Sequence, residues 1–197
     1  AYEMDPKLES KIASVALNLA NALMQQGDAL NSVGRILDAA ECFELAYRAE
    51  SIVPSTTANG DNIFNSGMLW TMHAASLQGE EAMAAFAKGE QLFSEVIAKG
   101  YTDANGNIYY YLFHCYYGQR EDNKENLVKA KNILLEGIEK FPKNERILDG
   151  LMSLYTAEEG IGDPAELVTM IDKFLAETPD NPDLWFGRGR VFYKLKN

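Results

Sequence analysis

The segment from Leu127 to Asn144, LVKAKNILLEGIEKFPKN, has the pattern of a helix that cannot bury its apolar face alone. Small and apolar residues recur at steps of three and four, which places them on one side of a helix. They are Leu127, Ala130, Leu134, Gly137, Ile138 and Phe141. The small members let a second helix approach closely, and the large ones fill the grooves beside it. Pro142 ends the helix because proline lacks a backbone N–H. The segment therefore predicts a helix packed between other helices.

In this segment Ala130, Leu134 and Gly137 form a small–large–small set. Its spacing recurs along the chain. It is found at Ala39, Phe43 and Ala46, and again at Gly89, Phe93 and Val96. A fourth copy keeps the spacing and a terminal proline but has large residues throughout, at Leu167, Ile171, Phe174 and Pro179. Successive copies begin 50, 41 and 37 residues apart. A loose period of this size is typical of helical repeat arrays.

These helices resemble the second helix of a tetratricopeptide repeat (TPR), and two further segments resemble the first helix of that family. One is NLANALMQQGD at 18–28. The other is DLWFGRGRVFYKLKN at 183–197, with an aromatic–small–aromatic set at Trp185, Gly189 and Phe192. The connection from Gly27 to Ala39 spans twelve residues, whereas the family uses about five, so the repeats are irregular.

The resemblance implies an all-α fold, a right-handed superhelical solenoid of antiparallel helix pairs. Residues 1–197 are expected to form a single TPR-like domain. Its approximate repeats are 7–54, 61–101, 107–142 and 144–179, with a partial repeat at 182–197. Ala1 and Pro6 resemble the end of a preceding second helix. The chain is therefore expected to be a fragment of a longer repeat protein, whose targeting segment could lie outside it.

Local signals predict the element boundaries. Helix-start signals are expected at Asp5, Asp61 and Asp163, and Gly27 is expected to stop the first helix. Residues 108–117 have strand propensity, but a lone strand among helices would have no partner, so we expect a helix there. The expected helices are 6–26, 35–52, 62–78, 80–99, 107–118, 124–141, 144–157, 164–177 and a last helix from Pro182.

Charge and composition exclude several classes of function. The chain has a net charge of −11, with 6 basic and 14 acidic side chains in residues 1–103 and 12 and 15 in residues 104–197. This balance argues against nucleic-acid binding, which needs a basic face. No apolar run reaches the roughly 20 residues of a membrane span, so we expect no membrane insertion. A soluble protein is expected, and the cytoplasm and the periplasm both remain open. Cys42 and Cys115 are expected to be free thiols.

Catalytic and metal-binding patterns are not found. The segment DANGN at 103–107 lacks the spacing of a calcium loop, because its glycine comes too early and His114 stands where the bidentate Glu belongs. His73 and His114 are the only histidines, and no cysteine pair with zinc-site spacing accompanies them. No nucleophile context is recognisable. We therefore predict no enzyme activity, no cofactor and no metal.

The aromatic segment 108–117 predicts two adjacent faces of one helix. Tyr109, Leu112, Phe113 and Tyr116 form the expected core face, and Tyr110, His114 and Tyr117 form the neighbouring one. In the TPR family the first helix of each repeat lines a concave groove. The resemblance places the following residues on matching faces: Ser14, Leu17, Asn21 and Met24; Ser66, Leu69, His73 and Ser76; Arg146, Asp149, Ser153 and Thr156; Phe186, Arg190 and Tyr193.

These faces imply a non-catalytic scaffold that binds a protein or peptide partner in the groove. The partner-binding residues predicted with most weight are Asn21, Met24, His73, Tyr110, His114, Tyr117, Arg190 and Tyr193. Two alternatives remain open: the recognition arm of a larger enzyme or regulator, and a helical protein that binds a small ligand. The last helix has no second helix after it, so its face with Trp185 and Phe192 predicts self-association through the C-terminal helix.

Overall fold

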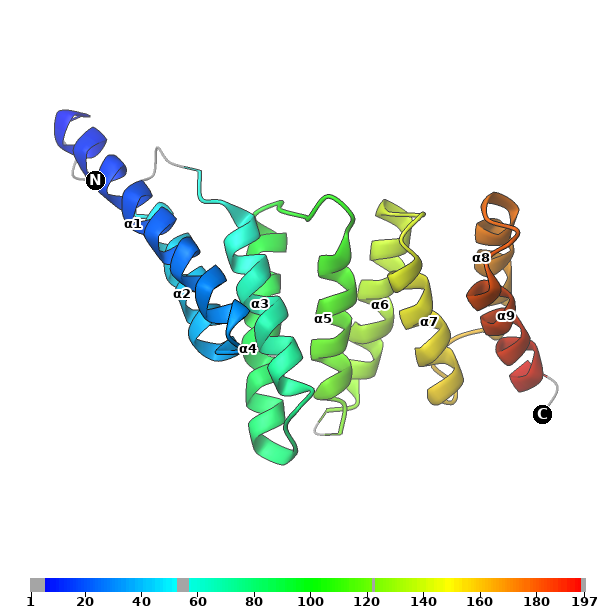
Figure 1. Cartoon of the computed structure of the whole chain (residues 1–197). Helices are drawn as coiled ribbons and strands as arrows, with labels where there is room; N and C mark the ends of the chain where they lie inside the picture. Colours follow the sequence, from blue (N-terminus) through cyan, green and yellow to red (C-terminus); the bar gives the residue numbers. More distant parts are fainter. Residues whose placement is uncertain (1–5, 53–56, 122, 196–197) are drawn as a thin grey trace. The chain divides into compact units, whose positions relative to one another are not determined.

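The computed structural model describes residues 6–52, 57–121 and 123–195, and in these ranges every regular element is an α-helix (Figure 1). The chain divides into two compact units, residues 1–103 and 104–197. The first holds α1 (Pro6–Ser32), α2 (Ile36–Glu50), α3 (Gly60–Ala74) and α4 (Gly79–Ala98). The second holds α5 (Asn107–Gly118), α6 (Glu125–Lys140), α7 (Glu145–Ala157), α8 (Pro164–Glu177) and α9 (Pro182–Leu195). The all-α prediction is confirmed for the described residues.

In the first unit the helices pack in chain order, α1 on α2, α2 on α3 and α3 on α4. Small residues set the approach of α1 to α2, where Ala20 meets Ala46 and Ala49. Farther along, Phe43 of α2 packs in a buried cluster with Leu69 of α3. The predicted small–large–small stripe of α2 is therefore its packing face, as the spacing indicated.

The prediction that Gly27 stops the first helix is wrong. α1 continues through Gly27 to Ser32, and the turn lies at 33–35, where Gly34 has a φ of 78°. A Cβ on Gly27 would lie 3.1 Å from Cζ of Phe43, so this glycine provides a close approach and not a helix end. Packing against Phe43 outweighs the cost of about 1 kcal/mol that glycine brings to a helix interior.

The expected helix-start signals differ in outcome. Asp163 does cap α8, since its side chain accepts a hydrogen bond from the backbone N–H of Ala165. Asp61 does not cap α3; the cap is Asn59, whose side chain accepts from the N–H of Asp61. Asp5 lies outside the described residues. The Asp61 prediction failed because Asn59 and Asp61 are both good capping residues, and Gly60 between them is already helical.

An ion-pair network joins α2 to α4. Arg48 donates to both carboxylate oxygens of Glu95, and Lys88 lies 2.8 Å from Glu44. Lys99 adds hydrogen bonds to Glu95 and to the hydroxyl of Tyr47. The hydrogen bond from Arg48 is the main reason that the pKa of Glu95 falls to about 2. The network therefore ties together helices that are separated by α3 in the chain.

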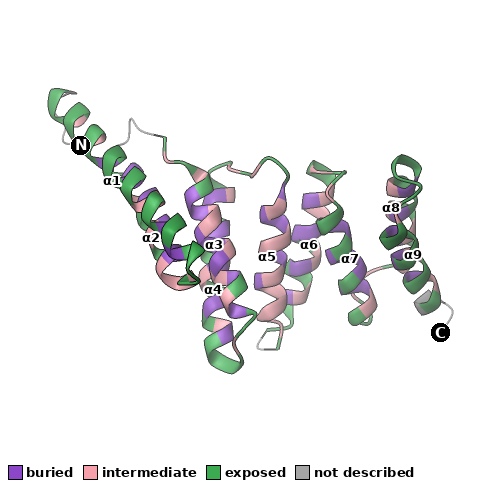
Figure 2. Ribbon diagram, in the orientation of Figure 1, coloured by how far each residue is buried: buried purple, intermediate pink, exposed green. Residues whose placement is uncertain are grey.

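In the second unit α7 is central, because it packs against α5, α6, α8 and α9. α6 carries the predicted stripe of small and apolar residues from Leu127 to Ile138. A Cβ on Gly137 of α6 would lie 2.7 Å from Cβ of Tyr109 and 2.9 Å from Cδ1 of Ile147, so one glycine receives both α5 and α7. Leu134 on the same face is fully buried. Figure 2 shows buried residues along the packed sides of the helices in both units.

The predicted core residues are confirmed. Phe43, Phe93 and Leu134 are buried, and so are the small residues that accompany them, Ala39, Gly89 and Ala130. Residues 107–118 form α5 with the predicted bounds. Cys115 is buried and Cys42 is half-buried, and neither of these described residues forms a disulfide. In the described ranges, none of the helices combines the length and the apolar composition that spanning a membrane would require.

Candidate functional site

α5 carries aromatic residues on two adjacent faces. Its start is set by Gly106, which has a φ of 72° and packs against the ring of Phe141. Tyr109, Leu112 and Phe113 are buried, which confirms the predicted core face. Tyr116, expected in the same core, is half-buried, and the ammonium of Lys129 lies 5.4 Å from its ring centre. The core face holds α5 in place and leaves its second face for other contacts.

That second face is the stripe of Tyr110, His114 and Tyr117, called here the α5 stripe. The Tyr110 and His114 rings meet edge to face at 4.5 Å between centroids, and Phe113 stacks on Tyr117 at 5.6 Å. Each of the three side chains is half-buried. The stripe is therefore a packed aromatic surface that retains exposed edges, which is the character of residues that anchor protein contacts.

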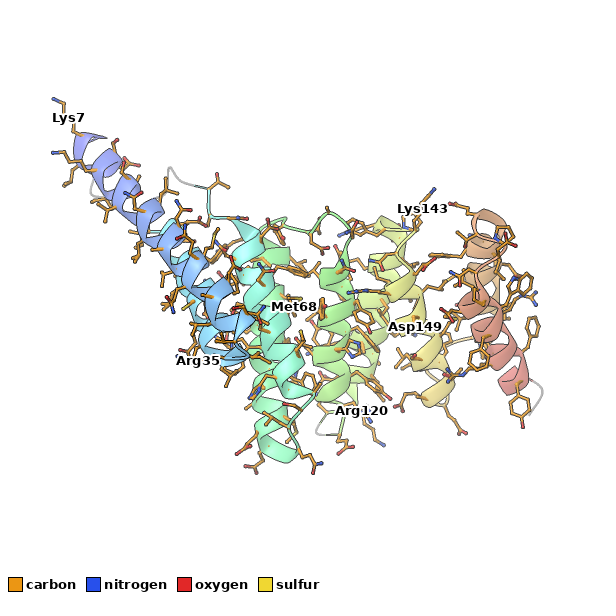
Figure 3. The ribbon with its side chains drawn as sticks, viewed as in Figure 1. Lys7, Arg35, Met68, Arg120, Lys143 and Asp149 are labelled. Atoms are coloured by element: carbon orange, nitrogen blue, oxygen red, sulfur yellow. The ribbon has the colours of Figure 1, made fainter. Side chains whose placement is uncertain are left out.

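Burial and a neighbouring carboxylate set the electrostatics of this stripe. Burial lowers the pKa of His114 below its ordinary value, and Asp149 of α7 acts in the opposite direction. Burial raises the pKa of the Tyr110 phenol, and Asp149 raises it further. A neutral imidazole and neutral phenols are therefore favoured at neutral pH. Figure 3 shows the side chains of this region, with Asp149 and Arg120 labelled.

Two charged residues hold the far end of the stripe. The Tyr117 hydroxyl donates a hydrogen bond to Oε1 of Glu158 at 2.9 Å. The Arg120 guanidinium lies 4.0 Å from the centre of the Tyr117 ring, and its Nε is 3.4 Å from the same carboxylate oxygen. A ring held by a hydrogen bond and a cation–π contact loses less freedom when a partner binds it.

A cleft of about 430 Å³ lies between α7 and α9. Its floor contains Met152 of α7 together with Leu184 and Gly187 of α9. Any side chain on Gly187 would occupy the position of the Met152 sulfur, so the glycine allows Met152 to lie against the backbone of α9. The cleft therefore has an apolar, polarisable floor of the kind that accepts varied apolar side chains.

Charged groups of both signs surround this floor. Arg190 of α9 donates from Nη2 to the Thr156 hydroxyl of α7 at 3.1 Å. Glu145 accepts a hydrogen bond from Asn181 at 3.0 Å, so it also links the two sides. Phe186 is 70% exposed beside the cleft. The remaining charged residues of the lining are Arg146, Asp149 and Asp183.

The structure brings together only part of the predicted binding set. Tyr110, His114 and Tyr117 share the α5 stripe, and Arg190 lines the α7–α9 cleft. Tyr193 is exposed on α9, one turn beyond Arg190.

Asn21, Met24 and His73 belong to the first unit. Asn21 is exposed on α1. Met24 packs against two buried clusters, one between α1 and α2 and one that also includes Leu69 of α3, so much of its surface is used within the fold. His73 lines a separate hollow on α3 and α4 with Trp70 and Lys88.

Some residues of the surface were not predicted from the sequence. Arg120 follows Tyr117 by three positions, a spacing that places two helical side chains together, so this contact could have been predicted from the sequence. The sequence contains no comparable signal for the contacts of Glu158, Met152 and Gly187, because these contacts join separate helices. In the described ranges no group of His, Cys, Asp and Glu side chains has the arrangement of a metal site.

No protein-family model matches the chain, and comparison with curated proteins and with solved structures likewise returns no significant match.

Proposed function

We propose that the chain is a non-catalytic, TPR-like scaffold that binds a peptide segment of a partner protein. The supporting observation is that α7 packs on both α5 and α9. These three are the helices that the resemblance assigns to the first position of their repeats. The α5 stripe and the α7–α9 cleft are therefore sites on adjacent helices of one unit. In the proposed architecture the helix pairs stack into a right-handed superhelix with this surface on its concave side.

The chemistry of the surface favours a neutral or basic peptide with an apolar anchor residue. The cleft floor is apolar, whereas its rim combines Arg146 and Arg190 with Glu145, Asp149 and Asp183. A site for a bound carboxylate would need cations without competing acids. The net charge of −11 also favours the approach of a basic partner.

Selection from a random peptide library on the full chain would test this function without a known partner. Peptides enriched on the wild type should lose affinity at least tenfold on the Tyr110→Ala/Tyr117→Ala variant, measured by fluorescence anisotropy. A matched control is Val128→Ala, which removes an exposed apolar side chain from α6. Circular dichroism checks that the helices remain. Equal binding to all three proteins, or loss only with Val128→Ala, would place the site elsewhere.

A second candidate function, binding of a small ligand, is favoured by a cavity of about 370 Å³ between α6 and α8. Its apolar lining is formed by Ile138, Pro142, Met170 and Phe174. Small-molecule sites have volumes of roughly 300–1,000 Å³ and mostly apolar walls. A fragment screen by NMR should then shift the Met170 methyl resonance, and Phe174→Ala should abolish that shift. Fragments that bind only the α7–α9 cleft would exclude this candidate.

A further inference from the structure

The N-terminal part of α1 extends beyond the helix that covers the rest of it. α1 has 27 residues, whereas α2 has 15 and folds back antiparallel through the turn at 33–35. Ala20 of α1 already packs beside Ala49, one residue before the end of α2. Residues before about Ala16 therefore pass the end of α2, as Figure 1 shows for the dark blue turns. Residues 6–19 are called the α1 arm.

The arm carries a stripe of large apolar residues beside the face that packs on α2. Toward α2, α1 presents two buried alanines, Ala16 within the arm and Ala20 directly after it. About a quarter turn around the helix from these alanines, Leu8, Val15 and Leu19 are 51%, 68% and 50% exposed. With the half-buried Ile12 they recur at steps of four, three and four, which is the seam spacing of a helix paired with another helix.

This seam is independent of the proposed partner-binding surface. The α1 residues that the resemblance assigns to the groove lie roughly on the opposite side of the helix at 3.6 residues per turn. They are Ser14, Leu17, Asn21 and Met24. A helix end with an apolar stripe in water gains little stability from its own propensity, since most helical stability in proteins comes from packing. A surface that covers the seam would therefore stabilise the arm.

We propose that the covering surface is the α1 arm of a second copy of this chain, paired antiparallel. The seam is self-complementary in this orientation. Leu8 then lies opposite Leu19 of the second copy, and Ile12 lies opposite Val15, about a twofold axis between Ala13 and Ser14. Each large residue thus meets another large residue, and the arms overlap over about 20 Å at 1.5 Å per residue.

Charge supports the same orientation. The arm carries Lys7, Glu9 and Lys11, a net charge of +1, whereas residues 20–103 carry 4 basic and 11 acidic side chains. A parallel pair would bring the two Lys7 side chains together, and likewise the two Glu9 side chains. The antiparallel pair moves the basic turn of each arm toward the acidic remainder of the other copy's first unit, which is complementary.

Sedimentation velocity of the full chain over a concentration series tests the association. The wild type should show a monomer–dimer equilibrium, and Val15→Glu/Leu19→Glu should weaken it at least tenfold because it places carboxylates in the seam. Both side chains are exposed, so the monomer should keep its helical circular dichroism. Leu45→Glu, at a similarly exposed apolar residue of α2, should leave the dimer unchanged. A monomeric wild type, or an equal loss of dimer with Leu45→Glu, would overturn the proposal. Loss of the dimer with Phe186→Glu alone would also overturn it, because association would then involve α9.

Disulfide formation tests the register in a Cys42→Ser/Cys115→Ala background. A Leu8→Cys chain mixed with a Leu19→Cys chain should cross-link, because these positions face each other. Leu8→Cys alone should not, because its two copies would lie about 16 Å apart along the helices. Self-linking of Leu8→Cys would indicate a parallel pair and overturn the proposal. Binding of the monomer to phosphatidylglycerol–phosphatidylcholine vesicles without dimerisation would overturn it in favour of a lipid surface.

Discussion

Truncation of Leu134 to alanine should destabilise the second unit strongly, because this side chain is fully buried on α6. It packs against α7, where a Cβ on Gly150 would lie only 3.0 Å from Cδ2 of Leu134. The residue is therefore in contact with helix backbone, which cannot shift into a vacated space as a flexible side chain can. The site should retain most of the cavity that the substitution creates.

The expected magnitude follows from two contributions. Burial is worth about 0.8 kcal/mol for each methylene, so removing three carbon atoms costs about 2.4 kcal/mol. A residual cavity of about 60 Å³ adds about 1.4 kcal/mol at about 24 cal/mol per Å³. The free energy of unfolding should therefore fall by about 3–4 kcal/mol, within the range of about 2–5 kcal/mol seen for such substitutions. Val128→Ala on the exposed side of α6 should change it by less than about 0.5 kcal/mol.

Urea unfolding can be followed in the second unit alone. The chain has two tryptophans, Trp70 in the first unit and Trp185 in the second. The Trp185 indole donates to the carbonyl of Pro179 at 2.7 Å, so its fluorescence should change on unfolding. In a Trp70→Phe background this signal reports the second unit. Circular dichroism on the same samples shows whether the two units unfold together.

A double-mutant cycle with Gly150→Ala tests the contact itself. In the wild type the added methyl is crowded by Leu134, which offsets the gain of about 1 kcal/mol in helix propensity. In the Leu134→Ala background the methyl enters the vacated space, so Gly150→Ala should be more stabilising there by about 1 kcal/mol or more. A Leu134→Ala effect as small as that of Val128→Ala, or no coupling with Gly150→Ala, would refute the reasoning.

Three further predictions concern packing and pH. Ala130→Leu should lower the free energy of unfolding by about 1–3 kcal/mol through overpacking, and an unchanged thermal midpoint would show that Ala130 is not at a close contact. Glu95 has a pKa of about 2 against an ordinary 4.5, so its stabilisation is present above pH 4.5 and is lost as the pH falls toward 2. Partial exposure reduces it to about 1–2 kcal/mol, and acid titration of Glu95→Gln should lack this contribution. Because burial lowers the pKa of His114, protonation favours the unfolded chain, and the free energy of unfolding should decline as the pH falls below 6.5. His114→Gln should remove the decline between pH 6.5 and pH 4.5 in urea titrations, above the range in which Glu95 titrates. A decline that persists in this window contradicts the assignment.

Most of the helices were predictable from the sequence because the spacing of apolar residues and the positions of helix-breaking glycine and proline residues indicate the same boundaries. α5 was assigned as a helix in spite of its strand propensity, since its neighbours were all helical, and its bounds were correct. The boundary prediction at Gly27 was wrong because sequence alone does not distinguish a glycine that ends a helix from one that lets a neighbouring side chain approach, here Phe43. The difference depends on what lies across the interface, which local pattern does not contain.

The candidate surface was predictable only within single helices. Spacing places Tyr110, His114 and Tyr117 on one stripe, and the stripe is present. The α7–α9 cleft depends on Met152 entering the space left by Gly187, a contact between residues 35 positions apart. Neither residue has a sequence signal for a binding site, so the shape of the cleft could come only from the packed helices.

Gly137 of α6, which receives both α5 and α7, limits how the second unit could be shortened or rearranged. Because α5 and α7 both approach this glycine, the α5–α6 pair does not complete its packing before α7 arrives. Repeat arrays with simple interfaces tolerate deletion of whole repeats as interchangeable modules. Here, a chain cut after residue 142 would leave Phe113 and Leu134 partly uncovered, because both lie against Gly150 of α7. α5, α6 and α7 should accordingly behave as one cooperative block, and replacing the helices after residue 142 would need a new residue in the place of Ile147.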